Sequence, residues 1–144
     1  LDAARRLSLV RDRWALRVPD LRQFQAVIDG PLARLSRLAA PLEDLRAMAG
    51  STPAVLQLVE RTASDVLAVV SLLTPPDELR AAHALLVSAA QLATTAARIR
   101  REAALSGDMS RAWDASSAAA GALMLTARVA SELQSALSLP QLTQ

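Results

Sequence analysis

The helical character of the chain is clearest in residues 74–108, which read TPPDELRAAHALLVSAAQLATTAARIRREAALSGD. Thr74 is positioned to cap the start of a helix, and Gly107 is positioned to end it. Apolar residues recur every three or four positions between them, which is the spacing of one helix face. The stretch therefore predicts a helix over 75–105, with an apolar stripe made of Leu79, Ala82, Leu86, Ala89, Ala93 and Ala96.

The same spacing continues on both sides of this helix. Downstream, Asp108 is a capping residue and predicts a helix over 108–138. Upstream, Ser51 or Thr52 followed by Pro53 predicts a helix over 53–73.

The first third of the chain also keeps a helical phase, but prolines interrupt it. We expect one helix or bent extension over 2–17 and a second helix over 19–49 that is kinked near Gly30. A separate helix beginning at Pro31 is the competing interpretation.

Short connections join the predicted helices, so consecutive helices should pack antiparallel. The sequence predicts an all-α fold: an antiparallel, up-and-down four-helix bundle with long helices and an extra N-terminal helix or bent extension. Residues 1–144 should form one domain, because no linker or internal repeat divides them.

Composition excludes several classes of protein. The chain has 31 Ala and 26 Leu residues, no cysteine, and no apolar run long enough to cross a membrane. The isoelectric point near 10.8 accompanies a net charge of only +2, because Lys and Tyr are missing and little titrates below the arginines. We therefore expect no nucleic-acid partner. Since the chain starts at Leu1, we expect it to be a fragment or a processed product.

The residues suited to catalysis are scarce. His83 is the only histidine, Cys and Lys are absent, and the acidic pairs are sequence neighbours that diverge on a helix. We expect no enzyme activity, no catalytic residues, no metal site and no cofactor.

The N-terminal segment carries the strongest signal for function. Leu7, Val10 and Trp14 share one helix face, and basic residues flank them: Arg6, Arg13 and Arg17. An apolar stripe that the rest of the chain does not cover marks a partner surface. We expect a protein partner or self-association into a homo-oligomer, with contact to a membrane surface as a further option. Alternatively, the segment folds back and Trp14 completes the core.

The Ala-rich faces of the last two predicted helices allow a second function. Small side chains there could leave a groove for an apolar ligand, with His83 or Trp113 at its mouth and Gly121 inside. Close packing of the two helices is the structural alternative for the same residues.

The run Thr74–Leu86 and the turn Ser106–Asp108 resemble a helical hairpin of uncharacterised bacterial proteins, many of which are lipoproteins or other extracytoplasmic proteins. The shared features are the Pro-Pro pair, a Leu and His83 in the first turns, and Gly-Asp at the hairpin. The resemblance implies an exported helical bundle without known catalysis. It implies no functional residues.

Overall fold

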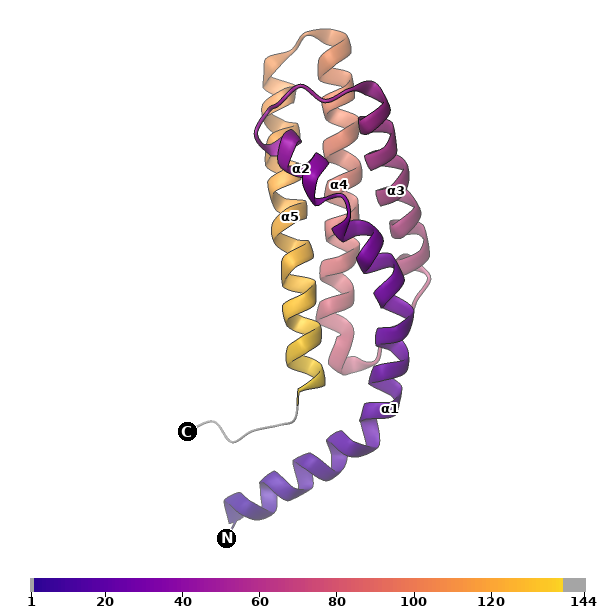
Figure 1. Cartoon of the computed structure of the whole chain (residues 1–144). Helices are drawn as coiled ribbons and strands as arrows, with labels where there is room; N and C mark the ends of the chain where they lie inside the picture. Colours follow the sequence, from indigo (N-terminus) through magenta and orange to yellow (C-terminus); the bar gives the residue numbers. More distant parts are fainter. Residues whose placement is uncertain (1, 139–144) are drawn as a thin grey trace.

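The structure is a computed structural model that describes residues 2–138. Within this range the chain is helical, which confirms the all-α class (Figure 1). In chain order the elements are α1 (Asp2–Ser36), α2 (Ala39–Arg46), α3 (Pro53–Ser71), the 3-10 turn η1 (Asp77–Leu79), α4 (Arg80–Ser106) and α5 (Met109–Leu137).

Helices α3, α4 and α5 lie side by side, and α4 contacts both of its neighbours along much of its length (Figure 1). The short helix α2 packs mainly on α5. The second part of α1 lies against α3 and α5, whereas its N-terminal part bends away and extends past the ends of α4 and α5.

Several helix ends lie where capping residues predicted them. Thr52 accepts a hydrogen bond from the backbone N–H of Val55 at 3.2 Å, at the start of α3. Asp108 accepts one from the N–H of Ser110 at 2.9 Å, at the start of α5. Gly107 ends α4 with a φ of 71°, a left-handed conformation that glycine adopts without steric cost.

The expected start of the helix over 75–105 is wrong. Pro76 is extended, with φ −63° and ψ 157°, η1 follows it, and α4 begins only at Arg80. A residue that precedes a proline is disfavoured in the α conformation, so two consecutive prolines keep Thr74 and Pro75 out of the helix.

The expected helix over 19–49 is also wrong, because it breaks at residues 37–38 and not near Gly30. Pro41 has no N–H for the carbonyl of Arg37, and its ring would clash there, so α1 ends and Pro41 enters the first turn of α2. Pro31 remains inside α1, as Pro19 does, and Gly30 before Pro31 has no Cβ to clash with the proline ring.

The core is apolar: among the described residues, no polar or charged side chain is buried. Leucine and valine fill the space between α1, α2 and α3, and alanine dominates the contact between α4 and α5, where Ala93, Ala96, Ala115 and Ala119 are fully buried. These small side chains let the two helices approach closely.

Candidate interaction surface

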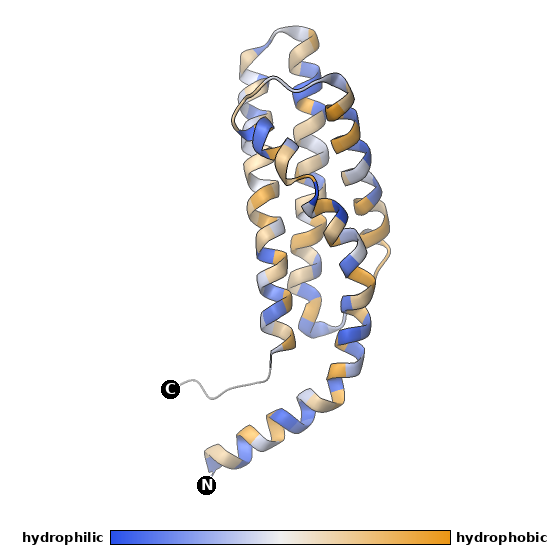
Figure 2. Cartoon of the chain, in the orientation of Figure 1, coloured by the Kyte–Doolittle hydropathy of each residue, from blue (hydrophilic) through white to orange (hydrophobic). Residues whose placement is uncertain are grey.

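Residues 2–17 of α1, which we call the arm, project from the rest of the molecule (Figure 1). None of the arm's predicted stripe residues belongs to the core of the described chain. Leu7 and Trp14 are half-buried, and Val10 is 46% exposed. Figure 2 shows apolar turns continuing into the arm between hydrophilic ones. The structure therefore brings the three stripe residues together on one segment and places no helix of residues 18–138 over them.

The stripe of the arm is in register with the buried face of the rest of α1. The buried residues of α1 are Leu21, Ile28 and Leu35, which lie seven positions apart. Leu7 and Trp14 continue this spacing towards the N-terminus. A seven-residue repeat keeps one face directed at a neighbouring helix. The face that packs on the core therefore extends into the arm, where its residues lie outside the described core and Trp14 Nε1 is shielded from solvent without a hydrogen-bond partner.

Three arginines border the stripe of the arm. Arg6 directly precedes Leu7 and Arg13 directly precedes Trp14. Arg11 directly follows Val10, on the other side of the stripe. All three are exposed, and none of them forms an ion pair within residues 2–138. The guanidinium groups on both sides of the stripe are thus available to acidic groups.

The third predicted partner-binding arginine, Arg17, has partners inside its own chain. Its Nε and Nη2 donate to the two carboxylate oxygens of Glu78 at 2.9 and 3.1 Å, and Nη1 lies 3.5 Å from Asp20. The hydrogen bond from Arg17 lowers the pKa of Glu78, and the same bond raises the pKa of Arg17. This bidentate pair ties the base of the arm to η1. Sequence reasoning missed it, because nothing in the pattern connects positions 61 residues apart.

Two further leucines lie away from the stripe. Leu9 is 58% exposed and Leu16 is 80% exposed. At about 100° per residue they lie roughly opposite Leu7 and Trp14 on the helix. The arm therefore carries apolar side chains on two faces.

His83 serves packing in this structure. Its Nε2–H donates to the backbone carbonyl of Val70 at 2.7 Å, and its ring centroid lies 6.3 Å from that of Phe24. The side chain links the start of α4 to the end of α3 and to α1. This arrangement occupies Nε2 in a hydrogen bond.

The three residues of the predicted ligand groove do not come together. Leu92 on α4 packs against Gly121 on α5. From that contact His83 lies nine residues back along α4, and Trp113 lies eight residues back along α5, so each is about 12–14 Å away in opposite directions. Trp113 is 64% exposed. A Cβ on Gly121 would lie 2.9 Å from Leu92 Cδ1, so that position is closely packed.

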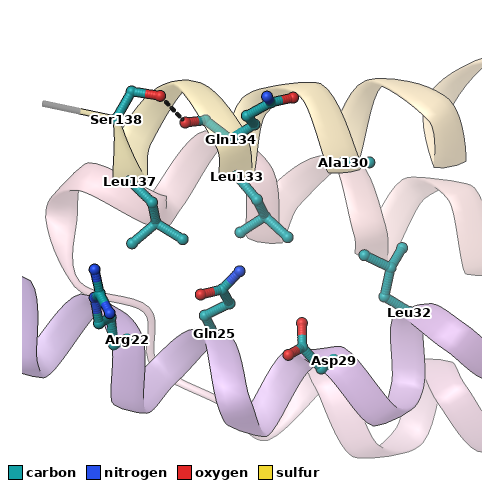
Figure 3. A pocket seen from close by; sticks show the side chains of 9 residues that line it. All are labelled: Arg22, Gln25, Asp29, Leu32, Ala130, Leu133, Gln134, Leu137 and Ser138. Atoms are coloured by element: carbon teal, nitrogen blue, oxygen red, sulfur yellow. Dashed lines mark hydrogen bonds between the residues drawn. The ribbon is translucent and has the colours of Figure 1, made fainter.

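A groove between α1 and α5 was not anticipated from the sequence. It has a volume of about 540 Å³ and is open to solvent. Gln25 projects from α1 towards α5, and Leu133 and Leu137 project from α5 towards α1 (Figure 3). Arg22 and Asp29 lie on the α1 side. Its walls belong to segments about 100 residues apart in the chain, so no local pattern could have indicated it.

The described residues contain no group of three or more histidine, aspartate or glutamate side chains arranged to hold a metal ion. None of the helices in residues 2–138 combines the length and the apolarity needed to cross a bilayer.

Comparison with known proteins finds no matching family model, no similar curated protein and no similar solved structure. The functional argument therefore depends on the geometry of this chain.

Proposed function

We propose that this chain is a non-enzymatic helical-bundle domain that acts in protein–protein contact or assembly through its arm. The observation that carries the proposal is the repeat of Leu7 and Trp14, which continues the buried face of α1 into the arm, where these residues lie outside the described core and Val10 beside them is exposed. Exposed apolar surface of this kind is typical of partner-binding sites.

The proposed architecture is an up-and-down bundle of four helical units. In this arrangement α1 and α2 together form the first unit, broken at residues 37–38, and α3, α4 and α5 form the other three. The short turns before α3, before η1 and between α4 and α5 support it. The core of such a bundle ends near Leu21, which leaves the arm outside.

Site-specific photo-crosslinking in the source cells tests the proposed function. A photoreactive amino acid at Val10 reports on the stripe, and the same amino acid at Leu16 is the matched control on another face of the arm. We expect protein adducts at Val10 in clear excess over those at Leu16. An adduct of twice the chain mass identifies self-association, and any other protein adduct identifies a partner. No excess at Val10 would contradict the proposal.

A further inference from the structure

We infer that the arm binds an acidic amphipathic helix of a partner protein, which packs on the stripe as in a short coiled coil. This inference rests on the proposed function and names the chemistry of the partner. It follows from three features of the arm: the register of its stripe, the charge beside the stripe, and the second apolar face.

The register specifies a helix as the occupant. Leu7 and Trp14 occupy one apolar position of a seven-residue repeat, and Val10 occupies the second, three residues after Leu7. Apolar residues at these two positions insert between side chains of a facing helix. The same repeat already packs on helices of this chain at Leu21 and Ile28.

The charge beside the stripe specifies an acidic partner. Arg6 and Arg13 occupy the flanking position before the first apolar residue, and Arg11 occupies the flanking position after the second. Flanking positions face each other across a coiled coil and select the partner by charge. Two copies of the arm would place arginine opposite arginine, whether they pair parallel or antiparallel. A helix with glutamate or aspartate at its flanking positions would instead pair with all three.

The second apolar face favours a protein over a membrane. A helix that lies in a membrane surface inserts one apolar face and keeps the other polar. The arm exposes Leu9 and Leu16 away from the stripe, and it carries Asp2 and Asp12. The arm therefore lacks the uniformly polar face that a helix lying in a membrane surface keeps towards water.

Titration with designed peptides tests the inference on the full chain. The probe is a peptide of three heptads with leucine at both apolar positions and glutamate at the flanking positions. The control peptide has lysine at those flanking positions. Trp113→Phe leaves Trp14 as the single tryptophan, so its fluorescence reports on the stripe. We expect a blue shift with the glutamate peptide, binding at least about tenfold tighter than with the lysine peptide, and weakening by added salt.

Charge reversal on the arm provides the matched variant. Arg6→Glu with Arg13→Glu changes two exposed side chains that form no ion pair in residues 2–138, so circular dichroism should show unchanged helix content. We expect this double variant to prefer the lysine peptide. Loss of binding to both peptides, or an unchanged preference for glutamate, overturns the assigned role of the arginines.

Other outcomes separate this inference from the proposed function. If the chain without the charge reversal binds the glutamate and lysine peptides equally, or binds neither, the inference of an acidic partner is overturned. Crosslinks from Val10 to protein would still support the proposed function. A dimer detected by light scattering and abolished by Trp14→Asp would also overturn the acidic partner and keep the proposed function, because a second copy of the chain would then cover the stripe. A blue shift of Trp14 fluorescence with anionic phosphatidylglycerol vesicles, together with no peptide binding and no protein crosslinks at Val10, overturns both the inference and the proposed function.

Discussion

At Gly121, helices α4 and α5 approach too closely for an added side chain to fit without movement. A Cβ there would lie 2.9 Å from Leu92 Cδ1, the mobile end of a leucine. Glycine inside a helix lowers stability by about 0.5–1 kcal/mol relative to alanine. The close contact with Leu92 explains why glycine is suited to this position.

We predict that Gly121→Leu lowers the free energy of unfolding by about 1–3 kcal/mol, the usual result of overpacking a closely packed site. Denaturant unfolding with circular dichroism measures it. Gly121→Ala is the matched control and should be near neutral, since its gain in helix propensity offsets a small shift of Leu92. In a Leu92→Ala background the cost of Gly121→Leu should fall. An equal cost in both backgrounds would mean that Leu92 is not the obstacle.

The ion pair between Arg17 and Glu78 should make stability depend on pH in a defined direction. Because Arg17 lowers the pKa of Glu78 in the folded chain, the unfolded chain binds the proton more readily. The stabilisation is therefore fully present above the ordinary glutamate pKa of about 4.3 and is lost as pH falls through the lower folded pKa. We predict that Glu78→Gln lowers the melting temperature at pH 7 and has no effect at about pH 2.5.

The comparison of melting temperatures needs a second carboxylate as its control. Glu132→Gln is suitable, since Glu132 lies 3.8 Å from Arg128 on the same helix and has no resolved link to another element. Exposed pairs of this kind contribute little. An effect of Glu78→Gln no larger than that of Glu132→Gln at pH 7 would argue against a fixed base for the arm.

In α1, one seven-residue apolar repeat supplies both the face that packs on the core and the stripe of the arm. Its second part packs on α3 and α5, while the arm leaves the same face open. Pro19 lies between the two parts and removes one backbone hydrogen bond, which provides a cause for the bend seen in Figure 1.

The three leucines of this repeat provide a matched series for a stability measurement. Leu21→Ala and Leu35→Ala should each lower the free energy of unfolding by about 2–5 kcal/mol, because both side chains are buried. Leu7→Ala should change it by at most about 0.5 kcal/mol, as expected for a surface position. A large cost at Leu7 would show that the arm packs on its own chain, the alternative that the sequence left open.

The helical class and three capped helix ends could be predicted from the sequence, since capping residues act locally, whereas the cap predicted at Thr74 was wrong. As expected, Thr52 caps the start of α3, Gly107 ends α4 and Asp108 caps the start of α5. Which of the prolines in the first third of the chain ends the helix could not be predicted in the same way. Pro19, Pro31 and Pro41 all interrupt one helical phase in the sequence, yet only Pro41 follows a break in the helix.

At the level of the whole molecule, stability should be distributed unevenly. The described core is apolar and joins α1 after residue 20 to α2, α3, α4 and α5, whereas the arm contributes nothing to it. A short helix without tertiary packing is marginal in water. The arm should therefore open locally without unfolding the remaining helices.

We predict that backbone amides of residues 2–17 exchange with solvent much faster than those in the centre of α4, on the order of a thousandfold or more. Hydrogen exchange followed by mass spectrometry measures this difference. The C-terminal half of α1 serves as the internal control and should exchange slowly. Equal protection of the arm and α4 in the chain alone would indicate that the arm is covered.

The sequence by itself determined the helical class, the helix ends at Thr52, Gly107 and Asp108, and the apolar phase that runs from Leu7 through α1, because these depend on neighbouring residues. It also identified the stripe of the arm, with Arg6, Arg13 and Arg17, as the segment most suited to a partner. Only the tertiary structure decided that Arg17 pairs with Glu78, that His83 bonds to Val70, and that α1 and α5 enclose a groove. These features join residues that are distant in the chain, and their energies depend on distances that exist only after the helices have packed.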